Sequence, residues 1–185
     1  MKRCIPVAFL LLTIGGCGQY TNIPAQVHLK SVDVPAGITY SFDATTKSIV
    51  STVVNPKITL ENELGSIGIT FDTMTVTYFV ASGRNSIPNT GTKADSSTHL
   101  RVAIRVPSSQ LNRDANGNVN APGSSGSIEL PVISPVVTSW GQTHFAEGNL
   151  SVAITLNGTD DASYPRSLDI NLPITLSGSV AVPSS

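Results

Sequence analysis

Apolar and polar residues alternate with a period of two along most of the chain after residue 26. Because successive side chains of a β-strand point to opposite faces, each such run predicts a strand with one buried and one solvent-facing side. The pattern predicts eight or nine strands, marked by these apolar positions: Val27 and Leu29; Ile38, Tyr40 and Phe42; Ile49 to Val54, leading through Asn55 and Pro56 into Ile58 and Leu60; Ile67, Ile69 and Phe71, followed by Met74, Val76, Tyr78 and Val80; Leu100, Val102, Ile104 and Val106; Ile128, Leu130 and Val132; Leu150, Val152, Ile154 and Leu156; Leu168, Ile170, Leu172, Ile174 and Leu176.

The pattern favours an all-β fold. No segment of about ten or more residues carries the i, i+3, i+4, i+7 spacing of an amphipathic helix. Short strands punctuated by Gly, Pro, Asn and Asp are typical of a sandwich or small barrel. We therefore expect an antiparallel, immunoglobulin-like β-sandwich over residues 26–185, with Pro131 and Pro173 at edges or bulges because they lack an N–H. The Val-Asn-Pro step at residues 54–56 resembles stress-related β-sandwich domains of the LEA type, and this resemblance carries no function across.

Two of the predicted loops are long, at residues 81–97 and 107–127. Loops beyond about 12 to 15 residues in a compact domain are usually functional or disordered. If successive strands alternate in direction, residues 107–127 share one end of the sandwich with residues 157–167. Residues 81–97 then share the other end with residues 140–148.

The first seventeen residues differ in composition from the rest. Lys2 and Arg3 precede a nearly unbroken apolar run at residues 5–14, and two glycines follow it. This is the layout of a secretory signal peptide. The apolar run is shorter than the roughly 20 residues that a helix needs to cross the hydrocarbon core, which disfavours a permanent transmembrane segment.

The segment Ile14, Gly15, Gly16, Cys17 resembles the lipobox of bacterial lipoprotein precursors. The resemblance covers only the leader. It implies that residues 1–16 are removed as a lipoprotein signal peptide, that the Cys17 thiol receives diacylglycerol, and that the new amino group is acylated, for example with palmitate. Two or more lipid chains hold a protein stably on a membrane, because each buried methylene contributes about 0.8 kcal/mol. An ordinary secreted protein with a stray cysteine is the alternative.

The resemblance also bears on location. Residues 17–25 would form the lipidated cysteine and a short tether, so the domain would lie close to the membrane of a bacterial cell envelope. Gly18 is not the aspartate that retains lipoproteins at the inner membrane, which favours the outer membrane where two membranes are present.

Composition narrows the classes of function. Without residues 1–16, 169 of the 185 residues remain, enough for one domain with a single core. Nine of the 11 basic residues remain against 12 acidic ones, a net charge of −3 without a basic run, which argues against nucleic acid as a partner. Cys4 and Cys17 are the only cysteines, so the mature domain has no disulfide, thiolate nucleophile or cysteine-based zinc site.

One loop contains oxygen ligands at alternate positions around Gly117. Calcium binds six to eight oxygens, and the expected sharing of ends brings a second acidic loop nearby. The run lacks the terminal glutamate of an EF-hand loop, and Asn-Gly is itself a strong turn signal, so a plain turn is the alternative. The candidate calcium ligands are Asp114, Asn116, Asn118, Asp160 and Asp161, and no other cofactor is expected.

Trp140, Gln142, His144 and Phe145 form the most aromatic loop of a chain that is 5% aromatic. An exposed ring beside amides can bind a glycan or a peptide, and Trp140, His144 and Phe145 are the candidate binding residues. The alternative is that Trp140 closes the end of the core, since large aromatic side chains are mostly buried.

No catalytic constellation is visible. His28 and His99 fall on the outward faces of their strands, and Gly123–Ser127 lacks the final glycine and the strand-to-helix context of a nucleophile elbow. We therefore expect a lipid-anchored, non-enzymatic binding, structural or adhesion-type module that contacts an envelope protein or a glycan. A carbohydrate-binding or hydrolytic envelope lipoprotein and a calcium-stabilised adhesin remain alternatives.

Overall fold

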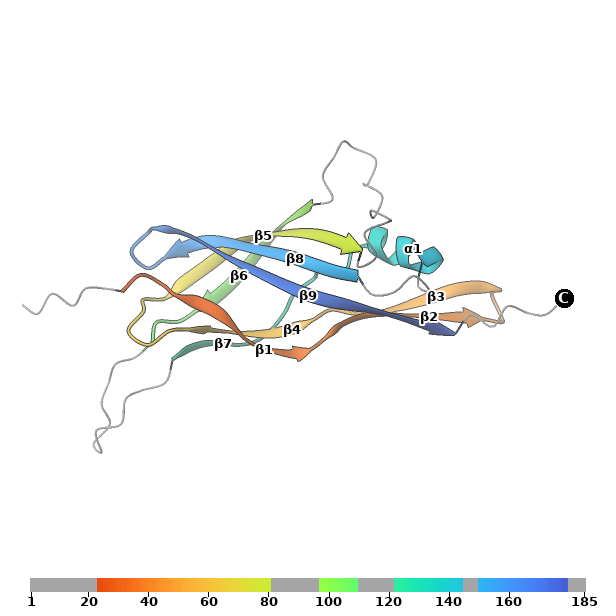
Figure 1. Cartoon of the computed structure of the whole chain (residues 1–185), viewed down its shortest axis with the longest axis horizontal. Coiled ribbons are helices and arrows are strands. Elements are labelled where there is room, and N and C mark those ends of the chain that lie inside the picture. Colours follow the sequence, from red (N-terminus) through yellow and green to blue (C-terminus); the bar gives the residue numbers. More distant parts are fainter. Residues whose placement is uncertain (1–22, 81–96, 110–121, 145–149, 180–185) are drawn as a thin grey trace, which may run out of the picture.

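The computed structural model describes residues 23–80, 97–109, 122–144 and 150–179. There the chain forms two sheets that pack together, which confirms the predicted all-β sandwich (Figure 1). The elements are β1 (Val27–Val34), β2 (Ala36–Asp43), β3 (Ser48–Val54), β4 (Lys57–Asn62), β5 (Ile69–Val80), β6 (Ser97–Val106), β7 (Gly123–Glu129), α1 (Pro135–His144), β8 (Leu150–Asp160) and β9 (Pro165–Ser179).

One sheet has three strands in the order β1-β4-β7, and the other has six in the order β3-β2-β9-β8-β5-β6. Paired strands are antiparallel except β2 and β9, which are parallel. Strand β9 changes its partner along its length: residues 165–174 pair with β8, and residues 174–179 pair with β2. Pro173 is exposed and lies one residue before β9 begins to pair with β2. Its missing N–H therefore costs no hydrogen bond to β2. Pro131 follows the end of β7.

Residues 27–62 form one long hairpin that passes from the smaller sheet into the larger one. The β1–β4 half pairs Val27 with Asn62, and the β2–β3 half ends by pairing Asp43 with Ser48. Pro35 on one strand and Asn55–Pro56 on the other stand where the hairpin changes sheet, since proline cannot donate to a ladder. Residues 54–56, whose sequence resembles that of LEA-type domains, thus lie at this crossing.

The alternating apolar residues supply the core. Burying one large aliphatic or aromatic side chain contributes about 1.5–3 kcal/mol, so a domain without disulfides can depend on such a core. The largest fully buried side chains come from both sheets, with Leu130 directly after β7, and are Tyr40, Phe71, Ile38, Ile58, Leu60, Ile69, Met74, Leu130, Leu150, Ile154, Leu156 and Ile174.

Helix α1 contradicts the expectation that no helix is present. Ser134 caps its N-terminus by accepting the Val137 N–H at 3.4 Å, and Pro135 occupies the first turn, where proline is tolerated. Val137, Trp140 and Gly141 form its buried face at i, i+3 and i+4. Only Val137 and Trp140 supply apolar side chains on this face, and Gly141 and the β-branched residues nearby disfavour a helix on propensity.

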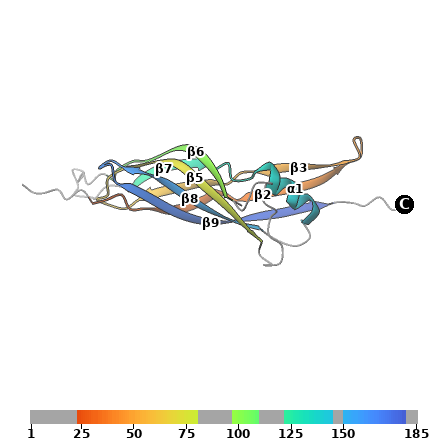
Figure 2. The ribbon, with the colours of Figure 1, turned by 90° about the horizontal axis from the view of Figure 1, so that it is seen from above.

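Helix α1 lies against the part of the larger sheet formed by β2, β3 and the end of β9, at one end of an elongated molecule (Figure 2). Tyr40 Oη donates a hydrogen bond to the Thr138 carbonyl at 2.8 Å. A Cβ atom at Gly141 would lie 3.1 Å from Tyr40 Cζ and closer still to Tyr40 Oη, so the small residue permits this approach. The helix closes the core over β2.

Residues 123–127, which we expected within a loop, belong to β7. Because these residues are mostly Gly and Ser, they show no apolar alternation that would predict a strand. The strand pairs with β4 through a register shift near Gly126, and the φ angle of Gly126 is 69°. The strand ends that flank these loops lie next to each other, as the expected strand directions require, but residues 81–96, 110–121 and 145–149 themselves lie outside the described residues. Arg105, just before residues 107–127, binds Asp161, and Val80, just before residues 81–97, pairs with Leu150.

Candidate functional site

Several predicted site residues lie outside the described residues. They are the lipid-attachment residue Cys17, the calcium candidates Asp114, Asn116 and Asn118, and the aromatic candidate Phe145. The hypotheses that depend on them remain predictions. Asp160, Asp161, Trp140 and His144 are described and can be placed.

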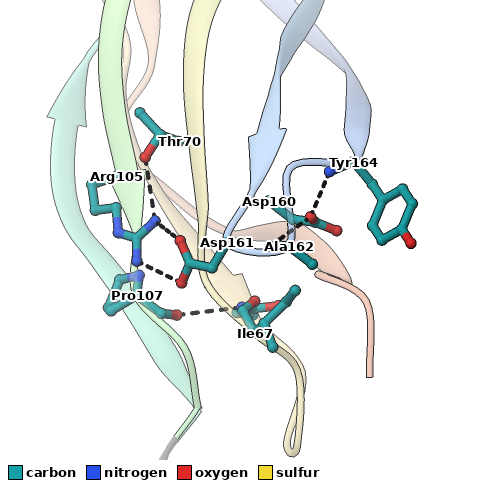
Figure 3. Close-up of polar contacts among 9 residues, drawn as sticks. Ile67, Thr70, Arg105, Pro107, Asp160, Asp161, Ala162 and Tyr164 are labelled. Atoms are coloured by element: carbon teal, nitrogen blue, oxygen red, sulfur yellow. Dashed lines mark hydrogen bonds and ion pairs between the residues drawn. The ribbon is translucent and has the colours of Figure 1, made fainter. Parts of the chain in front are cut away.

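Asp160 is the last residue of β8, at the start of the β8–β9 turn, and its side chain is fully covered. One carboxylate oxygen accepts the backbone N–H groups of Ala162 at 3.1 Å and Tyr164 at 2.9 Å (Figure 3). The other accepts the Arg166 Nε–H at 3.0 Å. Burial of the carboxylate opposes ionisation, but these donors outweigh it and lower the pKa of Asp160. Asp160 therefore acts as the ionised centre of a tight turn.

Asp161 faces the other way and forms a bidentate pair with Arg105, at 2.6 and 2.8 Å (Figure 3). The hydrogen bond from Arg105 lowers the pKa of Asp161. Both aspartates thus bind protein donors. In the ranges that the structure covers, no three His, Cys, Asp or Glu side chains group as a metal site would require.

Trp140 is only 5% exposed. Its ring stacks on the His144 ring with centroids 4.5 Å apart and 2° between the planes, and His144 Nδ1 lies 2.8 Å from the Trp140 carbonyl oxygen. A glycan platform requires an exposed ring, so this geometry favours the alternative in which Trp140 closes the core. Residue 144 is the last of α1 and half-buried.

The described histidines do not converge. His28 and His99 are exposed on their strands, as predicted, and they belong to different sheets. Thr75 Oγ1 lies 3.1 Å from Nδ1 of the His99 ring. The hollow beside the β8–β9 turn is lined by Asn157, Gly158, Pro165, Arg166 and Ser167, of which the only ionisable side chain is the Arg166 that binds Asp160.

Strand β3 is the most distinctive surface of the described chain. It forms one edge of the six-stranded sheet, and its seven residues, Ser-Ile-Val-Ser-Thr-Val-Val, include no charge. Val50, Val53 and Val54 are 40–45% exposed. All seven residues pair with β2 without a register shift, so the strand is regular and its outer edge presents a row of backbone groups.

The other three edge strands carry the features by which proteins block edge pairing, namely charges and bulges. Strand β1 exposes His28, Lys30 and Asp33 and has two register shifts. Strand β6 exposes Arg101 and Arg105 and pairs with β5 through a shift. Strand β7 ends at Glu129 and contains the irregularity near Gly126. Strand β3 has none of these.

Asp33 adds to the protection of β1. Its carboxylate accepts hydrogen bonds from the hydroxyls of Ser127 at 2.6 Å, Ser31 at 2.7 Å and Thr59 at 2.9 Å, which lower its pKa. These hydroxyls come from β7, β1 and β4, so one exposed anion ties the outer face of the smaller sheet together.

The β3 edge and the first described residue lie at opposite ends of the molecule. Ile23 forms a parallel bridge with Ser66, near the start of β1, whereas the β2–β3 turn projects at the other end (Figure 1). Asn62, fully buried at the Ile23 end, accepts the Gln26 N–H at 3.0 Å and donates to the Ile67 carbonyl at 2.5 Å. The chain entering the domain is thus fixed far from β3.

Fold and surface together define a small, elongated all-β sandwich with one uncharged, regular edge strand. Neither a protein-family model nor a curated protein matches the chain.

Proposed function

We propose that this chain is a lipid-anchored, non-enzymatic binding module of the bacterial cell envelope, of the structural or adhesion type. Cys17 holds it on the membrane, and β3 adds a strand from a protein partner to its sheet. In such strand addition, main-chain hydrogen bonds give affinity and alternate side chains give specificity.

The observation that carries this proposal is the separation of Ile23 from the β3 edge along the molecule (Figure 1). Cys17 precedes Ile23 by six residues, a reach of at most about 20 Å when extended. An anchor at that end leaves β3 directed away from the membrane. The glycan-binding alternative has no comparable support, because the Trp140 ring that it requires to be exposed is buried.

Intact mass of the protein from native membranes, beside a Cys17→Ser variant, tests the anchor. We expect a chain that starts at residue 17 and carries diacylglycerol and an acyl group, both lost in the variant. An unmodified mass would contradict the anchor.

A photoreactive residue in place of Val50 tests the edge in intact cells, with the same residue in place of His28 on β1 as the matched control. Both positions are exposed on edge strands. We expect a discrete protein adduct from position 50 and none from position 28. Equal labelling at both positions would contradict a role for β3.

A further inference from the structure

We infer that the strand added at the β3 edge is β3 of a second copy of this chain, paired antiparallel about a two-fold axis at Ser51. This inference rests on the proposed function, because it names the partner of the same edge. The two six-stranded sheets would join into one continuous sheet.

The register follows from the geometry of a strand. A two-fold axis perpendicular to a sheet keeps each side chain on its own face, so a residue must meet its own equivalent at the centre. With Ser51 at the centre, all seven residues of β3 find partners: Ser51 meets Ser51, Val50 meets Thr52, Ile49 meets Val53 and Ser48 meets Val54. Centring on either neighbour leaves part of the strand unpaired.

Facing side chains in this register are compatible. Ile49 and Val53 lie on the face that Tyr40 shares with α1, because β2 pairs them with Phe42 and Ile38. They therefore extend the apolar surface of that face across the junction. On the other face Val50 lies against Thr52, and pairs of β-branched side chains stabilise a sheet.

The absence of charge on β3 favours a second copy as the partner, and the position of Lys47 favours the antiparallel direction. Like charges directly opposite each other destabilise a sheet, and β3 brings none to either side. Lys47, just before the strand, would face the neutral Asn55 of the other copy, whereas a parallel in-register pair would put the two Lys47 side chains together. The edges of β1, β6 and β7 carry charges or bulges and do not match β3 in this way.

Cysteine crosslinking of the purified full chain tests the register. Opposite residues in an antiparallel pair have Cα atoms about 4.5–5.5 Å apart, within the range of a disulfide. We expect Ser51→Cys to give a disulfide-linked dimer under mild oxidation. Val54→Cys, on the same strand, should give none, because the two copies of position 54 lie about 20 Å apart. The double variant Ser48→Cys/Val54→Cys should crosslink again.

A charge swap tests the contact without cysteines. In the purified full chain, Val50→Lys with Thr52→Lys places like charges opposite each other twice and should weaken dimerisation at least about tenfold. Val50→Lys with Thr52→Glu places opposite charges at the same sites and should restore it to within a few-fold. Both positions are exposed, so the fold of the monomer is not at risk.

The outcomes separate this inference from the proposed function. No dimer from Ser51→Cys, or equal crosslinking from Ser51→Cys and Val54→Cys, overturns self-pairing. If position 50 then labels a different protein and the mass confirms the lipid, the proposed function stands with another partner. Loss of the lipid and of all labelling at position 50 overturns the proposed function itself.

Discussion

Asp160 and Asp161 are adjacent at the β8–β9 turn but differ in burial. The Asp160 side chain is fully covered and binds two backbone N–H groups and Arg166, whereas Asp161 and Arg105 are both nearly half exposed. An exposed ion pair contributes at most about 1 kcal/mol. The turn itself therefore depends on Asp160 far more than on Asp161.

We expect Asp160→Asn to lower the unfolding temperature at pH 7 clearly more than Asp161→Asn. Asparagine keeps an acceptor but not the charge that Arg166 binds. Thermal unfolding of the two variants beside the parent measures the difference. Equal losses would contradict the assigned role of the turn.

Both carboxylates have lowered pKa values, which predicts how stability changes with pH. Their contribution is present above the ordinary aspartate pKa of about 3.9 and is lost as the pH falls through the lower pKa of the folded protein. We expect both Asn variants to lose less stability than the parent on acidification below about pH 4. Urea unfolding at a series of pH values tests this, and parallel pH profiles would refute it.

Gly158 allows β8 to approach β5 closely. A Cβ atom there would lie 2.6 Å from Phe71 Cα and 2.7 Å from the Thr70 carbonyl carbon. Because backbone cannot move aside easily, Gly158→Ala should cost about 1–3 kcal/mol or more. Gly37→Ala is the control, since its Cβ meets only the Thr175 carbonyl oxygen at 3.6 Å, and it should change stability by less than about 1 kcal/mol. Denaturant midpoints distinguish the two.

At the scale of elements, α1 stabilises the end of the sandwich that β2 and β3 form. Trp140, the only tryptophan of the chain, lies on the buried face of α1. Trp140→Ala should cost about 3–5 kcal/mol through the cavity that it leaves. Thr143→Ala, on the exposed side of the same helix, should cost less than about 1 kcal/mol. Similar losses would mean that α1 is not a cover of the core.

The strands could be predicted because each buries one face, so burial imposes the period of two. Helix α1 could not be read from apolar spacing alone, since Val136, Val137 and Gly141 favour other structures; Ser134 and Pro135 at its start were the available signal. Residues 123–127 were missed because their small residues are held by pairing with β4 and show no apolar alternation.

The candidate site was only partly accessible from the sequence. The run Ile49–Val54 was recognised as a strand, and its lack of charge was visible. Its place at the edge was not, because edge and centre are decided by which strands pair at long range. Asp160 and Asp161 lie near residue 105, as the predicted strand directions require. Their carboxylates, however, bind Arg166 and Arg105, respectively.

At the scale of the whole molecule, antiparallel pairing at β3 directs the two Ile23 ends away from each other. Vesicles that carry the protein through Cys17 should therefore aggregate when mixed, which turbidity measures. The Val50→Lys/Thr52→Lys variant should abolish aggregation, and Val50→Lys/Thr52→Glu should restore it. Aggregation unaffected by either variant would contradict the arrangement.

The direction of the long hairpin has a consequence for cells. Copies anchored through Cys17 on one membrane would all point the same way, so crowding them together would not bring two β3 strands into antiparallel register. Only molecules that stand on two facing surfaces can meet in that orientation. Occupancy of the edge would then report how closely two envelopes approach, rather than how much of the protein each one carries.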